Sequence, residues 1–169
     1  KNLGKSPITV GNSGSIAVDI LPDNMCPTCD GLELVTANQV YAVDLNINTP
    51  QLSNLTLVQE VPNEKDGYSA IADFDLDGDQ DAFVISTPPG INIRGQVSFY
   101  VWDVQTNNVI SPRGSVYSFL GSFATPAIGY LNTDNSPDVV FNTRDSIYAF
   151  AYSANQWSRI FQIANMDMS

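Results

Sequence analysis

The sequence predicts an all-β fold assembled from repeated groups of strands, and two patterns along the chain support this prediction. Apolar and polar residues alternate clearly in residues 97–102, and β-branched and aromatic residues dominate the other apolar runs, as is typical of strands. No segment shows the sustained periodicity of 3.6 residues that an amphipathic helix requires. We therefore expect very little helix.

Three segments of the chain share one pattern, and they recur at intervals of about 55 residues. In each segment a short apolar strand leads into an acidic loop, and a second apolar strand leaves it. The predicted repeats are residues 13–61, 67–121 and 125–163, preceded by an outer strand of another repeat in residues 1–12. Each repeat has room for four strands, which in the second repeat are expected at residues 69–73, 82–86, 97–104 and 115–121.

The acidic loop of the second repeat is the strongest candidate for a functional site. Residues 73–81 read Asp-Phe-Asp-Leu-Asp-Gly-Asp-Gln-Asp, with Gly78 after the third aspartate. Ca²⁺ takes about six to eight oxygen ligands, which a carboxylate-dense loop with a turning glycine can supply. A solvated acidic turn is the alternative, but so many like charges repel one another unless a cation lies among them. The predicted ligand residues are Asp73, Asp75, Asp77, Asp79 (through its carbonyl) and Asp81.

The surroundings of this loop resemble a known family. Residues 68–85, Tyr-Ser-Ala-Ile-Ala-Asp-Phe-Asp-Leu-Asp-Gly-Asp-Gln-Asp-Ala-Phe-Val-Ile, are similar to the FG-GAP/VCBS repeat, the calcium-loop blade of integrin α-subunit β-propellers and of many secreted bacterial proteins. The resemblance covers every ligand position of the family's loop. It implies that each repeat is a four-stranded blade. Because propellers usually close with about four to eight blades, three repeats indicate a segment of a larger propeller.

The loop of the third repeat keeps part of this pattern. Tyr130 replaces the first aspartate and Asn135 replaces the glycine, although asparagine tolerates a positive φ better than most residues. With only two carboxylates, this loop is predicted to bind Ca²⁺ weakly at best. The positions that stay in register with the ligands are Asn132, Asp134, Ser136 and Asp138.

The loop of the first repeat departs furthest from the pattern. Asp19, Asp23 and Asp30 can align with the outer ligands, but extra residues that include Cys26-Pro-Thr-Cys29 lie among them. A local disulfide between these cysteines is the favoured interpretation and indicates an oxidising compartment. Either the disulfide replaces the cation as the link that holds the loop, which we favour, or it shapes a widened site that still binds Ca²⁺.

Composition excludes several classes of function. The chain has no histidine, which removes histidine-dependent triads and histidine-based metal sites. Its 7 basic and 18 acidic residues give a net charge of −11, whereas a surface that binds nucleic acid is basic. No apolar run approaches the length of about 20 residues that spans a membrane.

These observations predict a non-catalytic, extracellular, calcium-stabilised propeller module. By resemblance, such modules serve adhesion, cell-surface display or recognition of a protein or glycan partner, and the remaining blades of the parent propeller would be further partners. One alternative is the propeller part of a secreted carbohydrate-active enzyme whose active site lies outside this chain. Another is an architectural repeat of a surface filament or secretion complex. Since a fold alone does not assign a function, all three interpretations stay open.

Overall fold

The structure is a computed structural model of the chain, and its description covers residues 15–26, 31–44, 48, 54–62, 67–86, 94–119 and 126–164. This part of the chain contains thirteen β-strands and no helix. The predicted all-β class is therefore confirmed for the described residues. With no helix among them, none of these residues belongs to a helix that could cross a membrane.

The strands form three antiparallel sheets, which we call sheets A, B and C in chain order. Sheet A has the strand order β1-β2-β3-β4 and sheet C the order β10-β11-β12-β13. The strands of sheet A are β1 (Ile16–Val18), β2 (Glu33–Thr36), β3 (Gln39–Asp44) and β4 (Asn54–Glu60). Those of sheet C are β10 (Ala127–Gly129), β11 (Asp138–Asn142), β12 (Ser146–Ser153) and β13 (Gln156–Ala164).

Sheet B has five strands where four were predicted. They are β5 (Gly67–Ala72), β6 (Asp81–Ser86), β7 (Arg94–Asp103), β8 (Asn108–Val109) and β9 (Gly114–Phe119). Both β8 and β9 pair with β7, at opposite ends of that long strand. Between them Pro112 has no N–H to donate, and the hydroxyl of Ser111 accepts the N–H of Val101 at 2.8 Å. The outer strand of sheet B is therefore interrupted.

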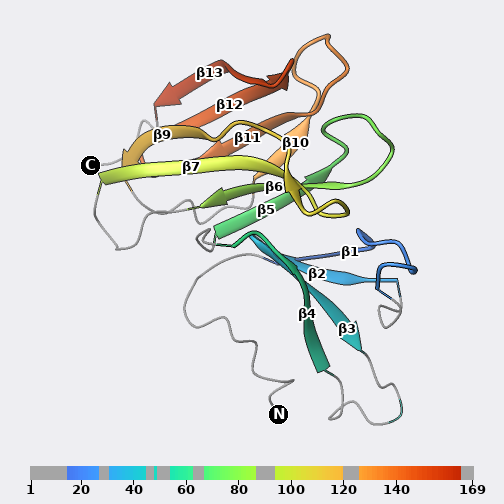
Figure 1. Cartoon of the computed structure of the whole chain (residues 1–169). Coiled ribbons are helices and arrows are strands. Elements are labelled where there is room, and N and C mark those ends of the chain that lie inside the picture. The colour runs from blue at the N-terminus through green and yellow to red at the C-terminus, as the bar shows by residue number, and fades with distance from the viewer. Residues whose placement is uncertain are drawn as a thin grey trace.

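The three sheets are stacked face to face, with sheet B between sheets A and C (Figure 1). Every residue of β6 is buried, because alternate side chains of a strand point to opposite faces and both faces are covered. Ala82 and Val84 belong to the apolar cluster shared with sheet A. Phe83 and Ile85 belong to the cluster shared with sheet C.

The contact between sheets B and C is dominated by aromatic rings. The ring centroid of Phe83 lies 6.3 Å from that of Phe141 and 5.9 Å from that of Trp157, and those of Phe99 and Phe150 are 4.9 Å apart. Such pairs stabilise a fold by about 0.5–1.5 kcal/mol each beyond the burial of their surface. The aromatic core thus fixes sheet C against sheet B.

Two polar atoms of aromatic side chains reach the interruption in the outer strand of sheet B. The Tyr152 hydroxyl donates to the carbonyl of Ile110 and the indole N–H of Trp157 donates to the carbonyl of Pro112, both at 2.8 Å. Because these acceptors lie at the break between β8 and β9, sheet C holds together the outer edge of sheet B.

Each sheet is built from one continuous stretch of chain, but the interpretation of the sheets as propeller blades stays a prediction. The three sheets of the described residues do not form a closed ring. The strand expected within residues 1–12 lies outside the described residues.

Phe83→Ala should lower the free energy of unfolding by about 3–5 kcal/mol, because it removes a fully buried ring and leaves a cavity between sheets B and C. Tyr117→Ala, which shortens an exposed aromatic side chain of β9, should change it by no more than about 0.5 kcal/mol. Urea denaturation of both variants measures the difference. Equal effects would contradict the described packing.

Candidate metal centre

The acidic loop of sheet B joins β5 to β6 and folds around its own carboxylates. Ala72 pairs with Asp81, so the loop leaves and re-enters the sheet at adjacent positions. Leu76 and Gly78 have φ values of 63° and 102°, which curl the backbone. The N–H groups of Asp77 and Gly78 donate to the carboxylate of Asp73 at 3.1 and 3.0 Å. The backbone of the loop thus orients its first aspartate.

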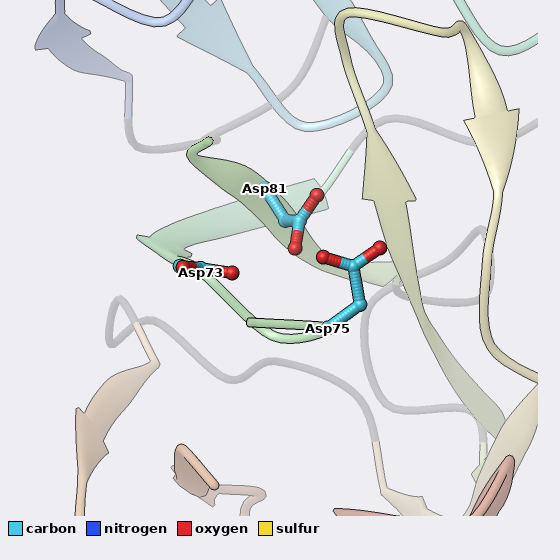
Figure 2. Close-up of side chains that lie close together, drawn as sticks. All are labelled: Asp73, Asp75 and Asp81. Atoms are coloured by element: carbon cyan, nitrogen blue, oxygen red, sulfur yellow. The ribbon is translucent and has the colours of Figure 1, made fainter. Parts of the chain in front are cut away.

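Three of the five predicted ligand residues come together at the base of this loop. Asp73, Asp75 and Asp81 each offer a carboxylate oxygen, and these oxygens all lie within 4.8 Å of one another (Figure 2). Two oxygens that each lie about 2.4 Å from one Ca²⁺ ion are at most about 4.8 Å apart. The spacing of the three carboxylates is therefore compatible with ligation of a single ion.

Asp81 is the innermost carboxylate of the cluster. Only 2% of its surface is exposed, and its Oδ2 accepts the N–H of Phe74 at 2.8 Å. Burial raises the pKa of the Asp81 carboxyl to about 7; the Phe74 hydrogen bond opposes this rise and neighbouring aspartates add to it. A cation bound among the carboxylates would have the opposite effect, since it favours the ionised form.

The mutual repulsion of the loop carboxylates also appears at Asp75. Burial raises the pKa of the Asp75 carboxyl, and the charges of Asp77 and Asp73 raise it further. The negative charge of the loop also acts on sheet C. Burial raises the pKa of the Tyr152 hydroxyl, and the charges of Asp75 and Asp81 raise it further. The described residues around the loop therefore favour a positive charge at its centre.

Asp77 and Asp79 lie outside the cluster. Both are exposed at the tip of the loop, and the Oδ1 of Asp77 accepts the N–H of Asp79 at 3.0 Å. In this conformation they shape the tip, whereas Asp73, Asp75 and Asp81 converge.

One acidic residue near the site was missed by the sequence analysis. Asp103 pairs with Asp81 across β6 and β7 and is buried. Its carboxylate accepts hydrogen bonds from both the N–H and the hydroxyl of Thr106, so it closes the turn that leads into β8. Its charge nevertheless adds to the rise in the pKa values of Asp75 and Asp81. Asp103 lies near the loop because β7 pairs with β6 in this register. The spacing of aspartates along the chain does not reveal that register.

The loop of sheet C repeats this design with fewer charges. Asp138 pairs with Gly129 as Asp81 pairs with Ala72, and it accepts the N–H of Leu131 as Asp81 accepts that of Phe74. Asn135 has a φ of 64°, as predicted for the residue in the place of the glycine.

The side-chain amide of Asn132 stands in place of one carboxylate in the loop of sheet C. The Nδ2 of Asn132 donates to Oδ1 of Asp138 at 3.1 Å, and the Oδ1 of Asp134 accepts the N–H of Ser136 at 3.1 Å. The buried carboxylate thus has an uncharged donor beside it. This arrangement lowers the need for a cation, and the weak binding of Ca²⁺ by this loop stays a prediction.

In sheet A the corresponding position is occupied by Glu33, which the sequence analysis did not single out. Glu33 is fully buried at the start of β2 and pairs with Val18. Its Oε2 accepts the N–H groups of Ile20 and Leu21 at 2.8 and 3.1 Å. Its Oε1 has no hydrogen-bond partner among the described residues.

The described residues that were predicted as ligands in the first loop do not form a cluster spaced for a metal ion. Asp19 and Asp23 are exposed, and Asp30 lies outside the described residues. Within the described part of the chain, the one group of three acidic side chains spaced for a metal is that of sheet B. Cys26 is disulfide-bonded and buried in the cluster with Ile20 and Leu21. Cys29 lies outside the described residues, so the Cys26–Cys29 pairing stays a prediction.

Comparison of the chain with protein-family models, curated proteins and solved structures gave no match. The similarity to the FG-GAP/VCBS repeat therefore depends on the residues of the second loop.

In metal-free buffer, the free energy of unfolding should fall as the pH rises from about 4 to about 7. The folded protein holds a proton on Asp81 up to about pH 7, whereas the ordinary pKa is 3.8, so the stabilisation is present below pH 3.8 and is lost as the pH rises through 7. Asp81→Asn should flatten this slope. Urea denaturation across the pH range tests it, and an identical slope in the variant would contradict the assignment.

Glu33→Ala should cost about 2 kcal/mol or more, because it leaves two buried N–H groups without an acceptor. Glu33→Gln keeps an acceptor oxygen and should cost about 1 kcal/mol or less. Chemical denaturation compares the two variants. The proposed role is wrong if glutamine destabilises the chain as much as alanine.

Proposed function

We propose that the chain is a non-catalytic, calcium-stabilised β-propeller module that acts outside the cell, in adhesion, surface display or recognition of a protein or glycan. The observation that carries this proposal is the convergence of Asp73, Asp75 and Asp81 in the loop between two strands. The residues around the loop resemble a calcium-binding blade, and the disulfide at Cys26 is typical of an oxidising compartment.

The chemistry of the donors favours a hard cation. The cluster offers carboxylate oxygens alone, and oxygen ligands suit Ca²⁺, Mg²⁺ and Mn²⁺, whereas zinc and copper favour nitrogen or sulfur. Among these, an irregular loop of carboxylates suits Ca²⁺, which tolerates irregular coordination, better than Mg²⁺, which requires an octahedron. Water and loop carbonyls would complete the coordination.

The role assigned to the ion is structural. It would offset the repulsion among the clustered aspartates and favour ionisation of the buried Asp81. Since the unfolded chain has no such site, the free energy of ion binding would add to the free energy of unfolding. The loop follows directly on β5 and precedes the buried β6, so an ion there would stabilise the middle sheet of the stack.

The partners of the module are proposed from the architecture. Sheets stacked with both faces buried are the arrangement of propeller blades, and the remaining blades of a parent propeller would extend the stack. A protein or glycan is the proposed recognition partner, because connecting loops on a rigid β-scaffold commonly carry binding functions.

Ca²⁺ should raise the thermal midpoint of the wild-type protein, and Asp75→Asn should largely remove this increase. Asp75 is the best residue to change because it belongs to the cluster but is exposed, so its replacement leaves the core intact. Loss of a direct ligand should weaken Ca²⁺ binding about tenfold or more, since even outer partners of a metal site have effects of that size. Isothermal calorimetry and differential scanning calorimetry measure both quantities.

Asp134→Asn is the matched control for this experiment. It makes the same change in the loop of sheet C, at a residue that is also exposed, and should leave most of the Ca²⁺ response in place. A wild-type protein whose midpoint does not respond to millimolar Ca²⁺ would refute the structural role of the ion. Equal losses in both variants would refute the assignment of the main site to sheet B.

A further inference from the structure

The outer face of sheet C, which points away from sheet B, is apolar and partly exposed. Ile147 and Ile163 pair across β12 and β13 and are 36% and 56% exposed. Beside them runs a second cross-strand row with no charged member, in which Ala127 is exposed, Val140 and Phe161 are half-buried and Ala149 is buried. This row consists of Ala127, Val140, Ala149 and Phe161.

The pairing register shows which faces of sheets A and B correspond to the outer face of sheet C. Glu33, Asp81 and Asp138 begin equivalent strands, so the residues two places further along, Val35, Phe83 and Val140, are equivalent too. Val35 lies in the apolar cluster that joins sheet A to sheet B, and Phe83 lies in the cluster that joins sheet B to sheet C. The outer face of sheet C is therefore equivalent to the faces that sheets A and B bury.

The opposite end of the stack carries the complementary face. In sheet A the row that points away from sheet B is Ala17, Leu34, Tyr41 and Leu57. Its equivalents in sheet B, which include Ala82 and Trp102, pack on sheet A. Its equivalents in sheet C, which include Val139 and Phe150, pack on sheet B. Leu57 is 42% exposed.

The outer face of sheet C and the outer face of sheet A thus correspond to the two surfaces that meet between sheets A and B and again between sheets B and C. Where the same interface occurs between sheets B and C, it covers Phe83 and Val101 completely. Both end faces are apolar and partly exposed, with Tyr41 and Ala149 buried within them, and an apolar patch that stays exposed commonly marks a site of association. Among the described sheets, the two faces that match each other by register are the outer faces of sheets A and C, so a second copy of the chain is an occupant that fits both.

We propose that the outer face of sheet C packs on the outer face of sheet A in a second copy of this chain. The contact is heterologous, since two different surfaces meet, and such contacts give closed rings or open stacks. Two copies would align six sheets, which lies within the range of about four to eight blades in closed propellers. This inference concerns the same two end faces that further blades of a parent propeller would cover, so on that point it rests on the proposed function. It depends on the stacking of the sheets and not on the bound ion, so it can fail or hold separately from the proposed role of Ca²⁺.

Sedimentation equilibrium of the whole chain, with and without Ca²⁺, tests the proposal. Two variants are compared with the wild type, and each places one positive charge on one of the two faces. Ile163→Arg alters the face of sheet C, and Leu57→Arg alters that of sheet A. Each side chain is exposed in the single molecule, so both variants should fold, as circular dichroism can verify. The wild type should self-associate, and each variant alone should associate about a hundredfold more weakly, because a buried unpaired charge is costly.

Mixing the two variants distinguishes the proposed geometry from other modes of association. The mixture should form heterodimers that neither variant forms alone, because the intact sheet A face of Ile163→Arg meets the intact sheet C face of Leu57→Arg. Tyr117→Arg, at a 65% exposed position outside both faces, is the control and should associate as the wild type does. If Ile163→Arg misfolds, Ile147→Arg tests the same face.

Two results would overturn the proposal. A wild-type chain that stays monomeric at every concentration would show that a second copy does not cover these faces, and a sheet from another polypeptide would become the candidate occupant. Association that Ile163→Arg abolishes and Leu57→Arg leaves unchanged would indicate that the sheet C face pairs with itself.

Discussion

A buried carboxylate at the start of the second strand is the interaction on which each sheet depends. Glu33, Asp81 and Asp138 occupy this position in sheets A, B and C. Each accepts the N–H of the residue two places beyond its cross-strand partner, namely Ile20, Phe74 and Leu131. A backbone N–H that leaves a ladder near the core needs an acceptor, and the carboxylate supplies it. The turn into the loop is thereby fixed before any ion binds.

The three loops differ in the groups that surround this carboxylate. In sheet C an asparagine amide donates to it, and in sheet A two backbone amides share one oxygen of the glutamate. In sheet B further aspartates surround it instead. One scaffold therefore carries one loop whose buried carboxylate lies among further carboxylates and two loops whose buried carboxylate accepts hydrogen bonds from uncharged donors.

Much of the fold could be predicted because strand periodicity is local. The four strands predicted for the second repeat lie within three residues of β5, β6, β7 and β9 at each end. The two-residue strand β8 was missed because its pairing with Trp102 and Asp103 has no signature in so short a segment. The positive φ of Asn135 was predicted because it depends on the residue type itself.

The candidate site was predicted in part, for a similar reason. The alternating aspartates indicated a metal loop, but which of them converge depends on the curl of the backbone, and Asp77 and Asp79 lie at the tip. Glu33 and Asp103 were missed because their places come from cross-strand register, which brings residues distant in sequence together. A search by strand register, in addition to aspartate spacing, would have found both.

The hydrogen bonds from Tyr152 and Trp157 to the interrupted outer strand have a consequence for how the molecule opens. Two carbonyls at the break in sheet B are bonded from sheet C, so separating the sheets exposes polar backbone as well as aromatic surface. Sheets B and C are thereby coupled into one cooperative unit. Sheet A meets sheet B through a cluster that is largely aliphatic. The two contacts of the middle sheet therefore differ in chemistry, and the one with sheet C resists separation by polar as well as apolar contacts.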